Sequence, residues 1–260
     1  MDTLLQTLAS IGSGALVGFI LGLIGGGGSI LATPLLLYVV GVAQPHVAIG
    51  TGALAVSASA YINFIDHARK RNVCWRCAAL FAVIGTLGAL AGSTLGKVID
   101  GQVLLFLFGL IMIVVGIAML RPRRECTGTI EVTTLRNCLR TALAAVVAGG
   151  AAGFFGIGGG FLIVPALIWA TGMSMRNAVG SSLLAVGSFG LATALNYAAS
   201  GLIDWKIAGL FILGGIGGGL AGTRLSLRLG SHRNALARIF AITVFAVALY
   251  ILYRSGPAVF

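Results

Sequence analysis

Apolar segments, nearly all of them long enough to cross a lipid bilayer as a helix, occupy almost the whole chain and are separated by short polar loops. Only 9% of the 260 residues are charged and 58% are hydrophobic, and the mean hydropathy is +1.05. Soluble domains carry about a quarter charged residues, so this composition is typical of a chain that lies largely in a membrane. We therefore expect an all-α polytopic membrane protein without a separate soluble domain.

The net charge of +11 does not indicate a nucleic-acid partner. The basic residues lie in short loops between apolar segments, as the positive-inside bias of membrane proteins predicts. Asp2 is the only charge before the first apolar run, so a cleaved signal peptide is not expected. The expected surroundings of the chain are the lipid bilayer, and no nucleic acid is expected to bind it.

Two glycine-rich stretches interrupt apolar segments, LGLIGGGGSILATP (21–34) and GFFGIGGGFLIVP (153–165). They open an internal repeat in which Pro34 pairs with Pro165 at a spacing of 131 residues. The spacing then becomes 130, where IGTGALAV (49–56) pairs with VGSSLLAV (179–186) and Trp75 with Trp205. The chain thus divides into a first repeat (1–121), a basic connector (122–137) and a second repeat (138–260).

Each repeat contains four apolar segments, at about 10–40, 46–66, 74–98 and 101–121 in the first and 138–170, 176–199, 204–229 and 233–254 in the second. Glycines divide the first segment of each repeat into two pieces. Helices over Ser10–Ile24 and Ser29–Val40 would rise only about 22 and 18 Å, less than the hydrocarbon core of about 30 Å. Each glycine segment is therefore either one broken span or a re-entrant hairpin.

Loop charge favours the hairpin. If all eight segments crossed the membrane, the 17 Lys and Arg residues would divide 11 to 6 between the two faces. With re-entrant glycine segments the division becomes 14 to 3, leaving Lys97, Lys206 and Arg254 on the less basic face. Basic loops are generally cytoplasmic. We expect two inverted repeats in the cell (inner) membrane, each a re-entrant segment plus three transmembrane helices, with the connector cytoplasmic and both termini outside.

The glycines suggest an anion site. A helix that begins inside the bilayer exposes unpaired N–H groups and the positive end of its dipole, and glycine lets a ligand approach the backbone closely. Inverted repeats with broken helices place such a site near the midplane. A dipole contributes only about 0.3–1 kcal/mol, whereas burying an ion costs several kcal/mol, so hydroxyl groups or water must contribute. The second half-helices are expected to begin near Ser29 and Gly160.

Candidate substrate-binding residues surround these breaks and the paired segments after them: Gly25, Gly26, Gly27, Gly28, Ser29, Thr51, Gly156, Gly158, Gly159, Gly160, Ser181 and Ser182. Candidate gate or secondary residues are Asn63, Arg176 and Asn196. Serine and threonine in membrane helices also bond to their own helix or to a neighbour. Arg176 also fits a basic residue that extends its charge to the cytoplasmic interface.

Other glycines are spaced four apart and indicate close helix packing instead: Gly88, Gly92 and Gly96, and Gly218 and Gly222. The Gly88 face could pack within the chain or form a homodimer. No acidic residue lies in mid-segment, so a driving ion is not identified. Cys74 and Cys77 form a CxxC motif without a second ligand pair, so we expect no metal and no cofactor. No catalytic constellation is visible, and an enzyme is not expected.

The glycine motifs GLIGGGGSILATPLLL and GFFGIGGGFLIVPALI, with GTGALAVSASAYINF and VGSSLLAVGSFGLATALNY, resemble the sulfite exporter TauE/SafE family over about residues 10–252. The resemblance implies a multi-pass carrier of small sulfur-containing anions, with a site at Gly25–Ser29, Thr51, Gly156–Gly160 and Ser181. The second motif departs from the first, because Ile157 replaces a glycine and Gly160 replaces the hydroxyl of Ser29.

The sequence therefore predicts a secondary transporter of sulfite or of organosulfonates such as sulfoacetate, working by alternating access. Two alternatives remain open: a passive anion channel of the same fold, and a carrier of other small carboxylates. The direction of transport and the coupling ion are not predicted.

Overall fold

A computed structural model of the protein describes residues 3–24, 26–120, 135–156, 159–173, 175–228, 242 and 244–255, and in these the secondary structure is helical without strands. The helices are α1 (Thr3–Ile24), η1 (Gly26–Leu31), α2 (Ala32–Tyr38), α3 (Pro45–Arg69), α4 (Trp75–Val98), α5 (Gly101–Leu120), α6 (Leu135–Phe155), α7 (Gly160–Thr171), α8 (Met175–Ala198), α9 (Trp205–Arg228) and Val244–Ser255. Among the described residues, five helices are long and apolar enough to cross a membrane. The all-α polytopic class is confirmed.

Both glycine stretches fold as hairpins. After α1 the chain turns back, so that Gly28 packs against the backbone of α1. The return reaches the start of α1, where Gln6 Nε2 donates a hydrogen bond to Val40 O at 3.4 Å. In the second half Gly159 packs against Ala152, and α7 lies along α6. Of the two alternatives for these segments, the structure has the hairpin.

The length expected for the first limb of the first hairpin is wrong. The helix begins at Thr3 rather than at Ser10 and has 22 residues, so it rises about 33 Å, enough to cross a hydrocarbon core. The apolar residues Leu4, Leu5 and Leu8 extend the helix toward the N-terminus. The returning limb is short, because η1 and α2 together cover only residues 26–38.

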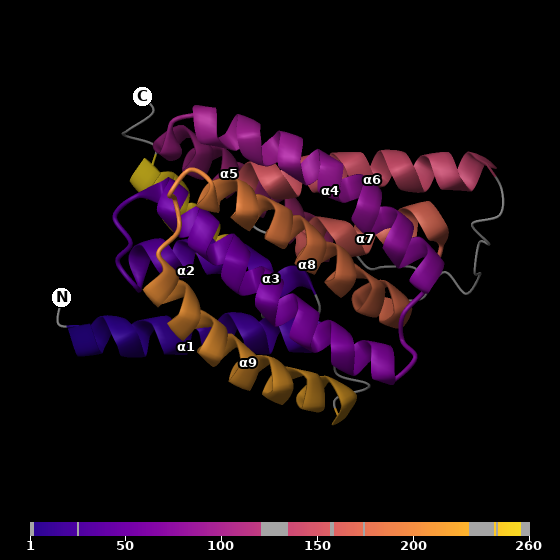
Figure 1. Ribbon diagram of the computed structural model, residues 1–260, viewed down its shortest axis with the longest axis horizontal. Coiled ribbons are helices and arrows are strands. Elements are labelled where there is room, and N and C mark those ends of the chain that lie inside the picture. The colour runs from indigo at the N-terminus through magenta and orange to yellow at the C-terminus, as the bar shows by residue number, and fades with distance from the viewer. Residues whose placement is uncertain are drawn as a thin grey trace.

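Two pairs of parallel helices form the flanks of the bundle. Gly14 of α1 packs against the backbone of Phe211 in α9, and Gly18 packs against the backbone of Gly215 further along both helices. In the other pair, α4 and α6, Gly92 backs onto Gly150 and Gly96 onto Phe154 in the same sense. The α1–α9 pair and the α4–α6 pair lie on opposite sides of α3 and α8 (Figure 1).

The central helices α3 and α8 run antiparallel. Ser57 Oγ donates to Gly187 O at 2.7 Å, while Gly50, near the start of α3, packs on Tyr197 near the end of α8. Through the repeat α1 corresponds to α6, α3 to α8 and α4 to α9, so exchanging the halves converts the α1–α9 pair into the α6–α4 pair. This is the packing that two inverted repeats would produce, and their inversion across a membrane stays a prediction.

Glycine makes the two parallel crossings possible. A Cβ atom at Gly92 would overlap the carbonyl oxygen of Gly150, and one at Gly218 or Gly222 would overlap the backbone of α1. The spacing of four residues thus builds a smooth face against which a neighbouring backbone lies. The close-packing interpretation of these glycines is confirmed, and the partner of the Gly88 face is α6 of the same chain.

Helix direction also defines two ends of the molecule. We call end A the end at which α3 begins (Pro45) and end B the end at which it finishes (Arg69). The start of α1 and the yellow helix of residues 244–255 lie at the same side of Figure 1, which is end A. Lys97, Lys206 and Arg254 lie at end A.

The remaining basic residues in the described part of the chain lie at or near end B: Arg69, Lys70, Arg71, Arg76, Arg136, Arg140, Arg176, Arg224 and Arg228. Five others belong to segments outside the described residues, 121–134 and 229–241. Where the structure describes them, the basic residues therefore segregate as the hairpin interpretation predicted.

Candidate functional site

The two hairpins meet in the core of the bundle, where η1 packs against α7. Ser29 and Ile30 of η1 and Ile163 of α7 are completely buried. These segments come from equivalent parts of the two repeats, and neither is long enough to cross a membrane alone. The described residues beside the two glycine breaks therefore lie against protein, the arrangement that a membrane interior tolerates.

The second hairpin turns at glycines that adopt left-handed conformations. Gly156 has φ of 65° and Gly159 has φ of 64°. Residues other than glycine rarely adopt this left-handed conformation. A Cβ at Gly156 would also overlap the side chain of Ile49 on α3. Gly159 is the N-cap of α7, so this half-helix begins at Gly160, as predicted. Gly158 lies outside the described residues.

The first hairpin turns differently. Its returning half-helix begins with η1 at Gly26, three residues before the predicted start near Ser29. Leu31 keeps right-handed angles (φ −87°, ψ −12°), so η1 continues directly into α2. A short 3₁₀ turn is common at the N-terminus of an α-helix, and the glycine run allows it here. Gly28 is buried against Leu21, Gly27 belongs to η1, and Gly25 lies outside the described residues.

Thr51 and Ser181 each bond the backbone of the opposite repeat. Thr51 Oγ1 accepts a hydrogen bond from the N–H of Asp204 at 3.0 Å, and Ser181 Oγ accepts one from the N–H of Cys74, also at 3.0 Å. Asp204 and Cys74 immediately precede α9 and α4. Both hydroxyl oxygens are therefore already hydrogen-bonded to a backbone N–H at the start of a helix.

The structure does not bring Thr51 and Ser181 together. Ser57 lies opposite Gly187, and from this point Thr51 is six residues toward end A while Ser181 is six residues toward end B. At 1.5 Å per residue the two hydroxyls are about 18 Å apart along the helix axes. A single small anion does not reach both.

Two other predicted residues offer little to a site at the hairpins. Ser182 Oγ donates to Val179 O of its own helix at 2.8 Å, the bonding pattern common for serine in membrane helices. Arg176 belongs to the first turn of α8 at end B, and the position of its side chain lies outside what the structure describes.

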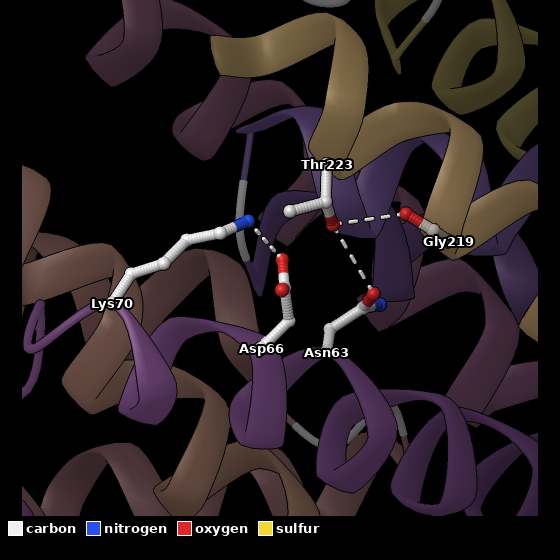
Figure 2. A network of polar contacts seen from close by, with 5 residues as sticks. All are labelled: Asn63, Asp66, Lys70, Gly219 and Thr223. Atoms are coloured by element: carbon white, nitrogen blue, oxygen red, sulfur yellow. Dashed lines mark hydrogen bonds and ion pairs between the residues drawn. The ribbon is translucent and has the colours of Figure 1, made fainter.

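Asn63 lies where α3 meets α9, near the turn of the first hairpin. Thr223 Oγ1 donates to Gly219 O at 2.9 Å and lies 3.3 Å from Asn63 Oδ1 (Figure 2). Figure 2 also shows the ion pair between Asp66 and Lys70, one turn further along α3. Asn63 is only 2% exposed, and its Nδ2 has no hydrogen-bond partner among the described residues.

Asn196 belongs to a polar cluster at end A that the sequence did not indicate. Its Nδ2 donates to Ser93 Oγ at 2.6 Å and to Thr94 Oγ1 at 3.0 Å, and its Oδ1 accepts from Lys97 Nζ at 2.8 Å. Lys97, which the loop-charge argument places on the less basic face, belongs to the last turn of an apolar helix. An isolated lysine inside a candidate span was the available signal.

Several buried polar groups have no protein partner in the described part of the chain. Besides Asn63 Nδ2, they include Thr33 Oγ1, Thr193 Oγ1 and the hydroxyl of Tyr197, in residues that are at most 1% exposed. Asn63 and Thr193 are equivalent through the repeat. A buried donor without a partner costs about 1–3 kcal/mol, and folded proteins pair nearly all of them. Each of these groups is therefore available to a ligand inside the bundle, but Asn63 and Thr193 lie six residues from Ser57 and Gly187 toward opposite ends and do not reach the same small anion.

The described residues contain no group of three or more His, Cys, Asp or Glu side chains able to hold a metal ion. Cys74 and Cys77 are free thiols whose Sγ atoms lie 3.0 Å apart. Carboxylates lie at helix ends, where Asp100 and Asp204 accept hydrogen bonds from first-turn N–H groups. The buried polar side chains without a partner in the described part of the chain are mostly hydroxyl and amide groups.

The described residues form a helical bundle with five candidate membrane spans and two internal glycine hairpins, which is the architecture of a multi-pass membrane protein. The family model described as "Sulfite exporter TauE/SafE" matches residues 10–251. The chain belongs to the sulfite exporter TauE/SafE family.

Its relatives carry the corresponding names. A "Probable membrane transporter protein" of Xylella fastidiosa (strain 9a5c) is 59% identical over 254 residues, with 97% of each chain covered. "Probable membrane transporter protein YunE" of Bacillus subtilis is 23% identical, covering 93% of this chain and 96% of its own. A "Probable membrane transporter protein" of Haemophilus influenzae is 26% identical, with 91% and 94% covered. No solved structure matches the chain.

Proposed function

We propose that the protein carries small sulfur-containing oxyanions, sulfite and organosulfonates such as sulfoacetate, across the cell (inner) membrane. The description of the family supports the choice of sulfite. The observation that carries the proposal is the meeting of η1 and α7 in a core that also holds unpaired buried hydrogen-bond donors. Neutral donors suit such a cargo, because they stabilise a negative charge without trapping it in a fixed ion pair.

The ligand site proposed here is the contact region of the two hairpins, not the Thr51 and Ser181 hydroxyls. The start of η1 at Gly26 and the start of α7 at Gly160 supply its backbone, while Ser29 lies within η1 and Thr33 is the second residue of α2. Helix N-termini favour anions through their N–H groups and the dipole. Thr33 adds a buried hydroxyl without a protein partner among the described residues.

Alternating access follows from the pairing of the helices. The α1–α9 flank and the α4–α6 flank each combine one helix from either repeat, with α3 and α8 between them. Rocking one flank against the central pair would open the hairpin region first to one end and then to the other. We place end B in the cytoplasm, because the basic residues gather there.

Transport by purified protein in liposomes tests the proposal. Labelled sulfite and sulfoacetate should accumulate in protein-containing liposomes and not in empty ones, and acetate should accumulate more slowly. Liposomes preloaded with unlabelled substrate should show counterflow of the label, which a passive channel does not produce. Absence of flux for every sulfur-containing anion would overturn the substrate class, and flux without counterflow would favour the channel.

A further inference from the structure

A cavity of about 570 Å³ opens at end A, away from the hairpins. The start of α3, the end of α4 and the start of α5 surround it, and its polar lining consists of Gln44, His46, Lys97, Asp100 and Gln102. Its volume falls in the range of small-molecule sites, about 300–1,000 Å³. Lys97 is the residue that this cavity shares with the polar cluster around Asn196.

Lys97 gives this cavity a positive charge that is held in place. Its ammonium donates to Asn196 Oδ1 at 2.8 Å, to Asn196 O at 3.2 Å and to Ser200 Oγ at 2.9 Å. All three acceptors are neutral oxygens, and among the described residues no carboxylate lies within ion-pair distance of this group. The three N–H donors of the ammonium are all used by these acceptors, so Lys97 acts on an anion in the cavity through its uncompensated charge, and a direct hydrogen bond would have to replace one of the three.

The start of α3 adds to this field. Gln44 is the N-cap of the 25-residue helix and makes no side-chain hydrogen bond to it, so the first-turn N–H groups have no side-chain cap. His46 is oriented by two carbonyls at the end of α4, since its Nε2 lies 3.3 Å from Gly96 O and 3.1 Å from Ile99 O. The positive end of the α3 dipole therefore faces the same cavity as Lys97.

Asp100 opposes these groups. Its Oδ1 accepts hydrogen bonds from the N–H of Gln102 at 2.8 Å and from the N–H of Val103 at 3.4 Å, which makes it a cap of α5. The carboxylate is thus committed to a helix start, but its charge still acts on the cavity. An anion would lie closer to Lys97 than to Asp100, and removing the Asp100 charge would strengthen its binding.

We propose that this cavity is a second site for small oxyanions, in which Lys97 and the start of α3 hold a sulfonate on its way between the hairpins and the aqueous phase at end A. The transported cargo rests on the proposed function, but anion binding in this cavity does not. Binding is therefore measured separately from transport.

The first experiment follows the modification of Lys97 in the purified wild-type protein. An amine-acetylating reagent is applied in the presence of methanesulfonate or of the same concentration of chloride, and peptides are quantified by mass spectrometry. Lys206, which is exposed on the first turn of α9 at the same end, is the internal control. Methanesulfonate should slow acetylation of Lys97 several-fold and leave Lys206 unchanged. An acetylation rate of Lys97 that is the same in methanesulfonate as in chloride would overturn the site.

The second experiment compares Lys97→Met with Lys206→Met in oriented liposomes. Lys97→Met should raise the half-saturating sulfite concentration several-fold when substrate is added at end A, and less when it is added at end B. Lys206→Met should behave like wild type, and Asp100→Asn should lower the half-saturating concentration at end A. Equal effects of Lys97→Met from both ends would make Lys97 a structural residue and contradict the proposal.

The two experiments separate the proposals. Protection of Lys97 without transport of any sulfur-containing anion would retain the cavity site and reject the proposed cargo. Transport of a sulfur-containing anion without protection of Lys97 would retain the proposed cargo and reject the cavity site. Should Lys97→Met fail to fold, the acetylation experiment on the wild-type protein still decides whether the cavity binds an anion.

Discussion

Thr51 accepts a hydrogen bond from the backbone N–H of Asp204, a residue of the other repeat, at 3.0 Å. The equivalent bond, from the N–H of Cys74 to Ser181, has the same length and lies toward the opposite end of the bundle. Each repeat therefore supplies a hydroxyl oxygen that accepts a hydrogen bond at the start of a helix in the other repeat. The two contacts tie the central pair, α3 and α8, to the flanking helices α9 and α4.

Removing these hydroxyls should weaken the fold. Ser181→Ala leaves the N–H of Cys74 without its partner, and hydrogen bonds between helices in membrane proteins contribute about 0.6 kcal/mol on average and up to about 1.7 kcal/mol. We expect a loss of stability in this range for Ser181→Ala and for Thr51→Val, measured as denaturant unfolding in detergent micelles. Ser182→Ala is the matched control, because Ser182 bonds only within its own helix turn. A control as unstable as Ser181→Ala would contradict the capping role.

Replacing Thr193 by valine should separate function from stability. The hydroxyl is completely buried without a partner among the described residues, so a valine of the same shape removes a group that costs about 1–3 kcal/mol. We expect Thr193→Val to unfold at the same temperature as wild type or higher and to transport sulfite at least ten-fold more slowly. Thr86→Val is the control, because the Thr86 hydroxyl donates to Ala82 O of its own helix. Wild-type flux in Thr193→Val would show that this hydroxyl does not meet the cargo.

The helical framework could be predicted from the sequence because local patterns specify it. Apolar length indicated the spans, and the repeat identified their counterparts. Consecutive glycines, which form no packing face, indicated a backbone break at Gly26 and at Gly156. Glycines four apart indicated the helix crossings at Gly92 and Gly218.

Much of the candidate site could not be predicted, because its partners are distant in the sequence. The repeat pairs Thr51 with Ser181 and so predicts ligand residues, but their hydrogen-bond partners lie 153 and 107 residues away in the sequence. The surroundings of Lys97 depend on Asn196, which is 99 residues further along the chain. Periodicity identifies which helix a residue belongs to, while its contacts depend on how the helices cross.

Adjacent glycines on α9 allow a test of the helix crossings. A Cβ at Gly218 would overlap the backbone of Ala15 on α1, whereas one at Gly217 would meet nothing within 4 Å. Gly218→Ala must push the helices apart, and overpacking of this kind typically costs about 1–3 kcal/mol. Gly217→Ala should be neutral or slightly stabilising, because alanine favours a helix by up to about 1 kcal/mol over glycine. Unfolding of both variants in detergent measures the difference, and equal stabilities would contradict the α1–α9 packing.

The direction of α4 and the distribution of basic residues predict which face of the membrane each end of this helix reaches. Gln102 is exposed at the start of α5 at end A, and Lys70 is exposed at the end of α3 at end B. Since basic loops are retained in the cytoplasm, Gln102→Cys should lie outside and Lys70→Cys inside. With the native cysteines replaced by alanine, a membrane-impermeant maleimide should label Gln102→Cys in intact spheroplasts and label Lys70→Cys only after permeabilisation. Labelling of both positions from the same side would contradict an odd number of crossings between them, and a reversed pattern would place end B outside.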